Sequence, residues 1–177
     1  MRITKRQLKR IIREEVNRAQ APQRRRLRRL HEATMSQAEL DQVLQQHELW
    51  VESNRAKGTR ALLSHADLSG ADLSGVDLSG VDLSGAQLHR ANLFGTDLSG
   101  ADLSRANLTG ADLTRANLFD ANLSNADLSY ADLSYTNLSG ASLTGANLSG
   151  ANLTGADLFD AKLSGVKGLE TVRGFKG

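Results

Sequence analysis

The 177-residue sequence contains no cysteine and only one proline. The absence of cysteine excludes disulfide bonds, thiolate nucleophiles and cysteine-based metal sites. Aromatic residues make up only 4% of the chain, so the core cannot rest on large rings. No apolar run reaches the roughly 18 residues of a membrane-spanning helix, and none follows the basic N-terminus as in a signal peptide. We therefore expect a soluble, cytoplasmic protein without a transmembrane segment.

Glutamate is also missing from residues 61–165, which hold twelve Asp and four Lys or Arg, a net charge of −8. Residues 1–30 hold twelve Lys or Arg and two Glu, a net charge of +10. The overall net charge of +2 conceals this asymmetry. A strongly basic segment joined to an acidic body predicts an anionic partner for that segment.

Residues 61–165 are twenty-one consecutive five-residue units, of which ADLSG at 71–75 is typical. The third position is always Leu, the first is small, the second is mostly Asp or Asn, and the fourth is mostly Ser or Thr. The fifth position is Gly in twelve units. A period of five would spread the leucines around a helix, or alternate them between the faces of a strand. Leucine stays on the inside only if the chain turns once per unit, and Asp, Asn, Ser and Gly are turn residues.

This A(D/N)LXX pattern resembles that of the pentapeptide-repeat family over 105 of the 177 residues. The resemblance implies a mainly β fold, a right-handed four-sided β-helix with four repeats per coil. Residues 61–165 would then form about five coils. At about 4.8 Å per coil, the solenoid would be roughly 25 Å long.

Two segments with helical periodicity precede the repeats. Residues 1–31 are predicted to form a basic leader whose amphipathic helix, about residues 5–19, carries Leu8, Ile11 and Ile12 on one face. Residues 32–60 are predicted to form an N-terminal cap and a linker.

The N-terminal cap is predicted to be a helix at about residues 37–53. Ser36 and Glu39 have the spacing of a capping box, which marks the start of a helix. The first coil has an open apolar end that needs covering. We expect the helix to cover it through Leu40, Val43 and Trp50, with His47 as a further packing residue.

Residues 166–177 form the C-terminal tail, in which apolar residues recur every three positions among glycines. We favour a tail that caps the last coil of a monomer. The alternative is that the tail covers this end together with a second copy, as a C-terminal dimer.

The repeats do not gather reactive groups. His65 and His89 lack acidic partners at the spacing of zinc ligands, and the serines have no neighbouring base. The glycines are spread along the chain and do not form a phosphate-binding loop. We therefore predict no catalytic, metal-binding or cofactor-binding site, and no enzymatic activity.

Departures from the repeat predict a partner-binding surface. With four repeats per coil, Phe119 and Phe159 fall on one face, two coils apart, and each is followed by an aspartate. An alternative is that each Phe packs over a neighbouring corner. The arginines of the repeats, Arg90, Arg105 and Arg115, fall on the other three faces. The aspartates on the predicted face are Asp77, Asp97, Asp120, Asp157 and Asp160.

The favoured interpretation is a structural or adaptor protein, a repeat rod with a basic docking leader that binds another protein. The opening MRITKRQLKRIIREE is similar to leaders of unrelated phage and bacterial proteins, which suits a component of a larger assembly such as a phage particle. The residues expected to contact the partner are Leu8, Ile11 and Ile12 with Arg6, Arg10, Arg13, Arg24, Arg25 and Arg26.

Two alternatives remain open. Some members of the family resemble B-DNA and inhibit DNA gyrase, but about 25 Å of duplex carries about fifteen charges, against a net of eight in residues 61–165. The leader alone could instead bind nucleic acid without sequence preference, or an anionic membrane surface.

Overall fold

The computed structural model describes residues 36–53 and 57–175, which belong to one compact unit, Thr34–Gly177. The predicted leader helix and its expected contact residues, from Arg6 to Arg26, lie outside the described residues.

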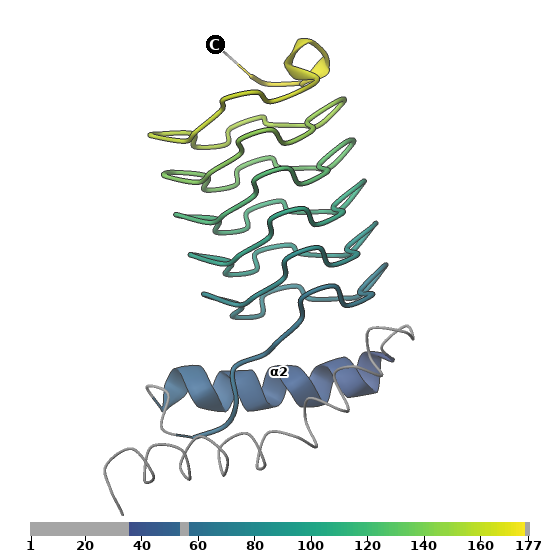
Figure 1. Ribbon diagram of the computed structural model, residues 1–177, viewed down its shortest axis with the longest axis vertical. Coiled ribbons are helices and arrows are strands. Elements are labelled where there is room, and N and C mark those ends of the chain that lie inside the picture. The colour runs from purple at the N-terminus through teal and green to yellow at the C-terminus, as the bar shows by residue number, and fades with distance from the viewer. Residues whose placement is uncertain (1–35, 54–56, 176–177) are drawn as a thin grey trace, which may run out of the picture. The chain divides into compact units, whose positions relative to one another are not determined.

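Helix α2 spans Gln37–Glu52, close to the predicted range (Figure 1). It begins with the predicted capping box. The Ser36 hydroxyl accepts from the Glu39 backbone N–H at 3.3 Å, and Glu39 Oε2 accepts from the Ser36 backbone N–H at 3.1 Å. These two bonds satisfy donors that a helix start leaves without partners inside the helix.

The repeats stack as coils with four repeats each (Figure 1). The second residue of a repeat forms a parallel bridge with the second residue 20 positions later, as between Asp72 and Asn92. The neighbouring Leu73 N–H donates to the Asn92 carbonyl at 2.8 Å. Because the chain turns in every repeat, β-structure within the described ranges is confined to isolated bridges instead of the extended strands that "mainly β" suggests.

Each turn follows from the residues around it. In the repeat at 66–70, the Ala71 N–H closes the turn on the Leu68 carbonyl at 3.0 Å. Asp67 Oδ1 accepts from the Ser69 N–H at 3.1 Å, which explains the preference for Asp or Asn at the second position. Gly70 has a φ of 68°, a conformation that glycine adopts without steric cost.

The core is a column of leucines. Every third-position Leu from Leu63 to Leu153 is no more than 2% exposed. First-position alanines fill the remaining interior. Where Thr96 and Thr136 replace alanine, their buried hydroxyls donate to the carbonyls of Leu73 and Leu113, both at 2.8 Å, so neither polar group lacks a partner.

The C-terminal tail continues the last coil as far as Arg173, although we expected it to fold over that coil. Lys167 and Arg173 bridge to Asn147 and Asn152, and the short helix η1, Leu169–Thr171, fits one extra residue between them. Gly rather than Leu follows both bridging residues, at positive φ. Leu158 and Leu163, in the last coil, are half-exposed.

Candidate protein-binding face

The bridges sort the repeats into four faces, and one of them is acidic. Its second positions pair in series through residues 77, 97, 117, 137 and 157. We call the five repeats at 76–80, 96–100, 116–120, 136–140 and 156–160 the acidic face. It carries five of the twelve Asp of residues 61–165 and none of the four Lys or Arg, a net charge of −5. The other three faces carry 0, −1 and −2.

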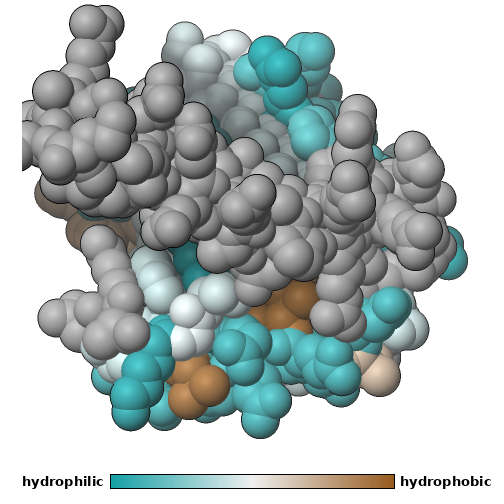
Figure 2. Space-filling model, turned by 60° about the horizontal axis from the view of Figure 1, so that its bottom comes forward, coloured by the Kyte–Doolittle hydropathy of each residue, from teal (hydrophilic) through white to brown (hydrophobic). Residues whose placement is uncertain are grey.

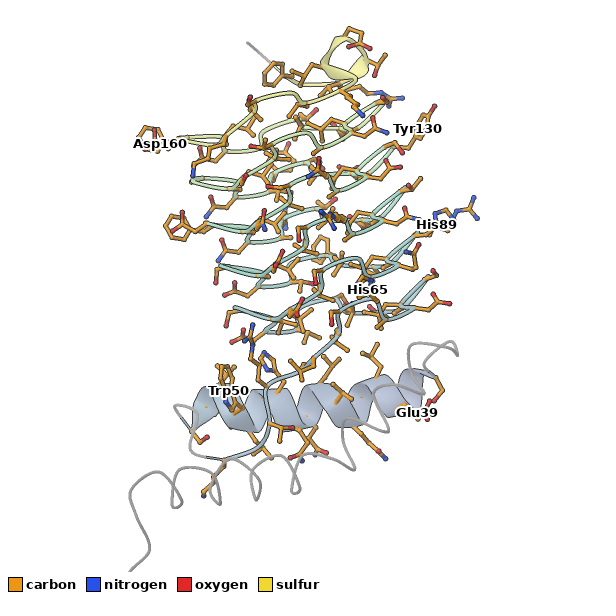
Figure 3. The ribbon with its side chains drawn as sticks, in the orientation of Figure 1. Glu39, Trp50, His65, His89, Tyr130 and Asp160 are labelled. Atoms are coloured by element: carbon orange, nitrogen blue, oxygen red, sulfur yellow. The ribbon has the colours of Figure 1, made fainter. Side chains whose placement is uncertain are left out.

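The acidic face also bears two exposed phenylalanines. Phe119 is 47% exposed and Phe159 is 71% exposed, so packing at a corner covers only part of each ring. The register places them two coils apart, as the sequence predicts, with Ser139 and Gly140 in the coil between. Figure 3 shows Asp160 at one side of the solenoid, and Tyr130 and His89 at the opposite side.

Asp120 and Asp160, which follow these phenylalanines, adopt left-handed backbone conformations, with φ of 53° and 55°. Glycine would adopt this conformation at less cost, by about 1 kcal/mol. The other fifth-position residues, such as Arg90 and Tyr130, have the same conformation, so it is a property of the coil and does not by itself mark these two aspartates as functional.

The Asp120 carboxylate leans toward the next coil. Its Oδ1 occupies the space that a Cβ would need at Gly140, so a side chain at position 140 would displace the carboxylate. The carboxylate therefore lies over the coil that separates the two phenylalanines.

Hydrogen bonds between coils hold the acidic face in shape. Asn137 Nδ2 donates to Asn117 Oδ1 at 3.0 Å, and Asn117 Nδ2 donates to Asp97 Oδ1 at 3.1 Å. The Ser139 hydroxyl lies 2.7 Å from Asn137 Oδ1 and 3.0 Å from Asp157 Oδ2. A partner would therefore meet a preorganised surface, which lowers the entropic cost of binding.

The predicted cap residues lie on α2. Leu40 is 1% exposed, and Val43 and Trp50 are half-buried. The fully buried His47 stacks on Trp50 with ring centroids 5.6 Å apart, and its Nδ1 accepts from the Ala61 N–H at 3.3 Å. The other ring nitrogen, Nε2, is buried without a hydrogen-bond partner. Burial lowers the pKa of His47, the Asp77 carboxylate opposes this shift, and the Arg60 charge adds to it.

A groove between α2 and the first coil continues the acidic face. Figure 2 looks onto this end of the unit, where hydrophilic residues (teal) surround smaller apolar patches (brown) on the coloured surface. The groove adjoins Asp77, and its other carboxylates come from α2. Its lining residues are Asp41, Gln42, Leu44, Gln45, Glu48, Gly75, Val76 and Asp77.

Other chemistry has little support in the part of the chain that the structure describes. Within 36–53 and 57–175, no three Asp, Glu or His side chains gather closely enough to hold a metal ion. His89 Nδ1 lies 3.0 Å from the Thr109 carbonyl oxygen, which is a structural contact. Among the helices described, none is long and apolar enough to cross a membrane.

Sequence reasoning did not single out three further exposed aromatic residues. Phe94, Tyr130 and Tyr135 are 43%, 75% and 63% exposed. Phe94 and Tyr135 lie on one face next to the acidic face, and Tyr130 lies on the opposite face. The Tyr130 ring reaches within 2.8 Å of the position of a Cβ at Gly150, one coil later. A fifth-position residue with glycine 20 positions later is the sequence signal for this arrangement.

A family profile described as "Pentapeptide repeats" matches residues 59–95, 86–125, 96–133 and 126–165. Among solved structures, the pentapeptide repeat protein Rfr23 from the cyanobacterium Cyanothece 51142 is 40% identical, with a TM-score of 0.51 over 52% of this chain. The match covers 63% of the Rfr23 chain, so this chain spans less than two thirds of that relative. No match is found among curated proteins.

Two other solved structures show the range of similarity. The pentapeptide repeat protein alr5209 from Nostoc PCC 7120 is 38% identical, with a TM-score of 0.39 over 62% of this chain and 83% of that chain. QnrB1, a plasmid-mediated fluoroquinolone resistance protein, is 24% identical, with a TM-score of 0.27 over 62% of this chain and 65% of that chain.

Proposed function

Because this chain belongs to the pentapeptide-repeat family, whose fold is a right-handed quadrilateral β-helix, we propose that it is a non-enzymatic adaptor whose solenoid displays a protein-binding face. Residues 76–160 present that face and residues 1–31 act as a basic docking segment. In this proposal, the adaptor is a component of a larger bacterial or phage assembly.

The concentration of charge on one face is the observation that carries the proposal. The acidic face has a net charge of −5, while none of the other three exceeds −2 in magnitude. The same face holds the exposed residues Phe119 and Phe159. Aromatic anchors ringed by charges of one sign are typical of a protein-binding surface, since the rings supply affinity and the charges supply orientation.

The same concentration of charge weighs against mimicry of B-DNA. A duplex carries charge along both strands, at one negative charge per about 1.7 Å. Here three of the four faces carry a net charge between 0 and −2 in residues 61–165. A protein that tracks DNA grooves would find too few negative charges on those faces.

Partner recovery by full-length variants tests the proposal. The first variant, Phe119→Ser with Phe159→Ser, removes both rings of the acidic face. The second, Leu8→Ser with Ile12→Ser, alters the apolar positions of the leader. Phe94→Ser is a matched control, because Phe94 is similarly exposed but belongs to another face.

We expect the control to retain the native partners of the wild type. Loss of partners in both double variants supports an adaptor that uses two surfaces. Loss of partners in the acidic-face variant alone means that residues 1–31 are not needed for partner binding. Unchanged recovery in both double variants overturns the proposal.

A further inference from the structure

We propose that the acidic face is the docking site for the basic residues 1–30 of a second copy of this chain, so that copies join head to tail. The inference rests on the proposed function, since it names the partner of the same protein-binding face. It adds that the partner is a further molecule of the protein itself.

Charge complementarity is the first argument. Residues 1–30 carry a net charge of +10, and the acidic face carries −5 without any Lys or Arg. No other face of the solenoid combines a large negative charge with the absence of cations. A basic segment would therefore select this face among the four and would also be steered toward it.

The Phe–Asp pairs provide the second argument. Each pair has an exposed ring followed at the next position by an aspartate at positive φ. A Lys or Arg side chain fits such a pair, because its alkyl stem packs on the ring while its charge meets the carboxylate. The two pairs are Phe119–Asp120 and Phe159–Asp160.

The spacing of the two pairs is the third argument. They lie two coils apart, which corresponds to about 9.6 Å at about 4.8 Å per coil. On the helix that the sequence predicts for residues 5–19, seven residues rise about 10.5 Å. Arg6 and Arg13 are seven positions apart, so one helical segment matches both pairs at once.

The acidic groove beside α2 lengthens this docking surface. Glu48 of α2 lines the groove together with Asp77, the first aspartate of the acidic face. The carboxylates thus continue from the groove along the solenoid. A basic segment of thirty residues has more positive charges than the two Phe–Asp pairs can neutralise, and this extension offers partners for the remainder.

A contact of this kind is heterologous, because it joins two different surfaces of the same protein. Each copy would carry one basic segment and one acidic face. Unless the rotation between copies closes a ring, such contacts build an open chain. Self-association should therefore increase with protein concentration and should weaken as salt screens the charges.

Complementation between two full-length variants tests the inference. One variant, Arg6→Gln with Arg10→Gln and Arg13→Gln, keeps the acidic face. The other, Asp120→Asn with Asp160→Asn, keeps the leader and is near isosteric, and Asn tolerates positive φ. Asp82→Asn with Asp102→Asn is the matched control, because it removes two carboxylates from the face with zero net charge.

Sedimentation velocity at about 50 mM and about 500 mM salt measures the association. We expect the wild type and the control to associate at low salt and to dissociate at high salt. Each test variant alone should associate at least about tenfold more weakly, while an equimolar mixture of the two should form 1:1 dimers that grow no further.

Three outcomes would overturn the inference: a wild type that is monomeric at low salt, an acidic-face variant that associates like the wild type, or a mixture without dimers. A circular dichroism melt of each variant checks that the fold is intact. The proposed function is judged separately by partner recovery. If the wild type does not self-associate but the variant with Phe119→Ser and Phe159→Ser loses foreign partners, the proposed adaptor function is supported. Only the proposal that the partner is a second copy is then wrong.

Discussion

The two ends of the solenoid are finished in different ways. At the N-terminal end, α2 packs on the first coil, and Leu63, Leu68, Leu73 and Leu78 are all no more than 2% exposed. At the C-terminal end, the chain runs on as a last partial coil, and Leu158 and Leu163 stay half-exposed. The third position is Leu in the repeats at both ends, so the difference comes mainly from what flanks the repeats.

This difference shows that the repeat supplies the coil and the flanking segments decide how firmly each end is closed. At the first coil a helix contributes its own buried residues, Leu40 and His47. At the last coil, glycine after Lys167 and Arg173 ends the leucine column without covering it. We therefore expect the first coil to be the better protected end.

A charge in the leucine column should show the largest contrast between the ends. Leu73→Asp places a carboxylate under α2 without a partner, so we expect no cooperative thermal melt. Leu163→Asp places the same group at the half-exposed end, where water can reach it, and the protein should still fold. Circular dichroism melts of the two variants compare the ends, and equal effects would mean that both are closed alike.

Truncation of apolar residues should show a smaller contrast in the same direction. Leu40→Ala should lower the free energy of unfolding by about 2–4 kcal/mol, because the Leu40 side chain of α2 is fully buried. Val166→Ala should lower it by about 1 kcal/mol, because Val166 is half-buried. Urea denaturation measures both values. A larger loss of unfolding free energy in Val166→Ala than in Leu40→Ala would mean that the C-terminal end is the more firmly closed one.

Acid should loosen the N-terminal end selectively. Because burial lowers the pKa of His47 in the folded state, folding favours the neutral ring, whose Nδ1 accepts from Ala61. This stabilisation is fully present above the unfolded-state pKa of about 6.5 and is lost as the pH falls through the folded-state pKa. Hydrogen exchange should then speed up in α2 while the amides of Leu153 and Ala161 remain protected. His47→Phe should remove this pH dependence, and its persistence in that variant would assign it to another group.

The polar caps at the two ends should differ only slightly. Ser36→Ala removes the capping box of α2 and should cost about 1 kcal/mol. Thr171→Val removes a hydroxyl that accepts from the Gly150 N–H at 2.8 Å and donates to the Gly168 carbonyl at 2.8 Å, and should cost about 0.5–1 kcal/mol. Urea denaturation compares them. A clearly greater loss at Thr171 would show that η1 closes its end more firmly than its exposure suggests.

A substitution of an outward side chain in the middle coils should have the smallest effect on stability. It gives the reference value with which the substitutions at both ends are compared. Ser104→Ala keeps the bond from the Ser104 N–H to Asp102 Oδ1 at 2.9 Å and should change stability by less than about 0.5 kcal/mol. A loss as large as that of Leu40→Ala would contradict the assignment of the fourth position to the outside.

The sequence was sufficient to predict the coil because its two determinants are local. The fixed Leu position sets the inside, and Asp or Asn two residues before the fourth-position N–H sets the turn, as at Asp67. The capping box likewise places the start of α2 within a few residues. The placement of Phe119 and Phe159 on one face could be predicted by counting repeats, because four repeats per coil determine the face on which each residue lies.

Features that depend on contacts across the chain were not predictable in the same way. The acceptor role of His47 depends on where Ala61 lies, 14 residues later. The buried hydroxyl of Thr96 bonds to the Leu73 carbonyl in the previous coil, which the pattern of small first positions does not reveal. The extra residue that η1 fits into the last coil has no counterpart in any earlier repeat.

The 20-residue bridge spacing has a consequence for how such a chain can change length. Adding or losing one repeat turns everything beyond it by a quarter of the circumference. If one repeat between Phe119 and Phe159 were lost, the second ring would move to a neighbouring side and the two would no longer share a surface. If four repeats are gained or lost together, every outward residue stays on its own face. The surface of this protein is therefore preserved through insertions and deletions only when they come in whole coils.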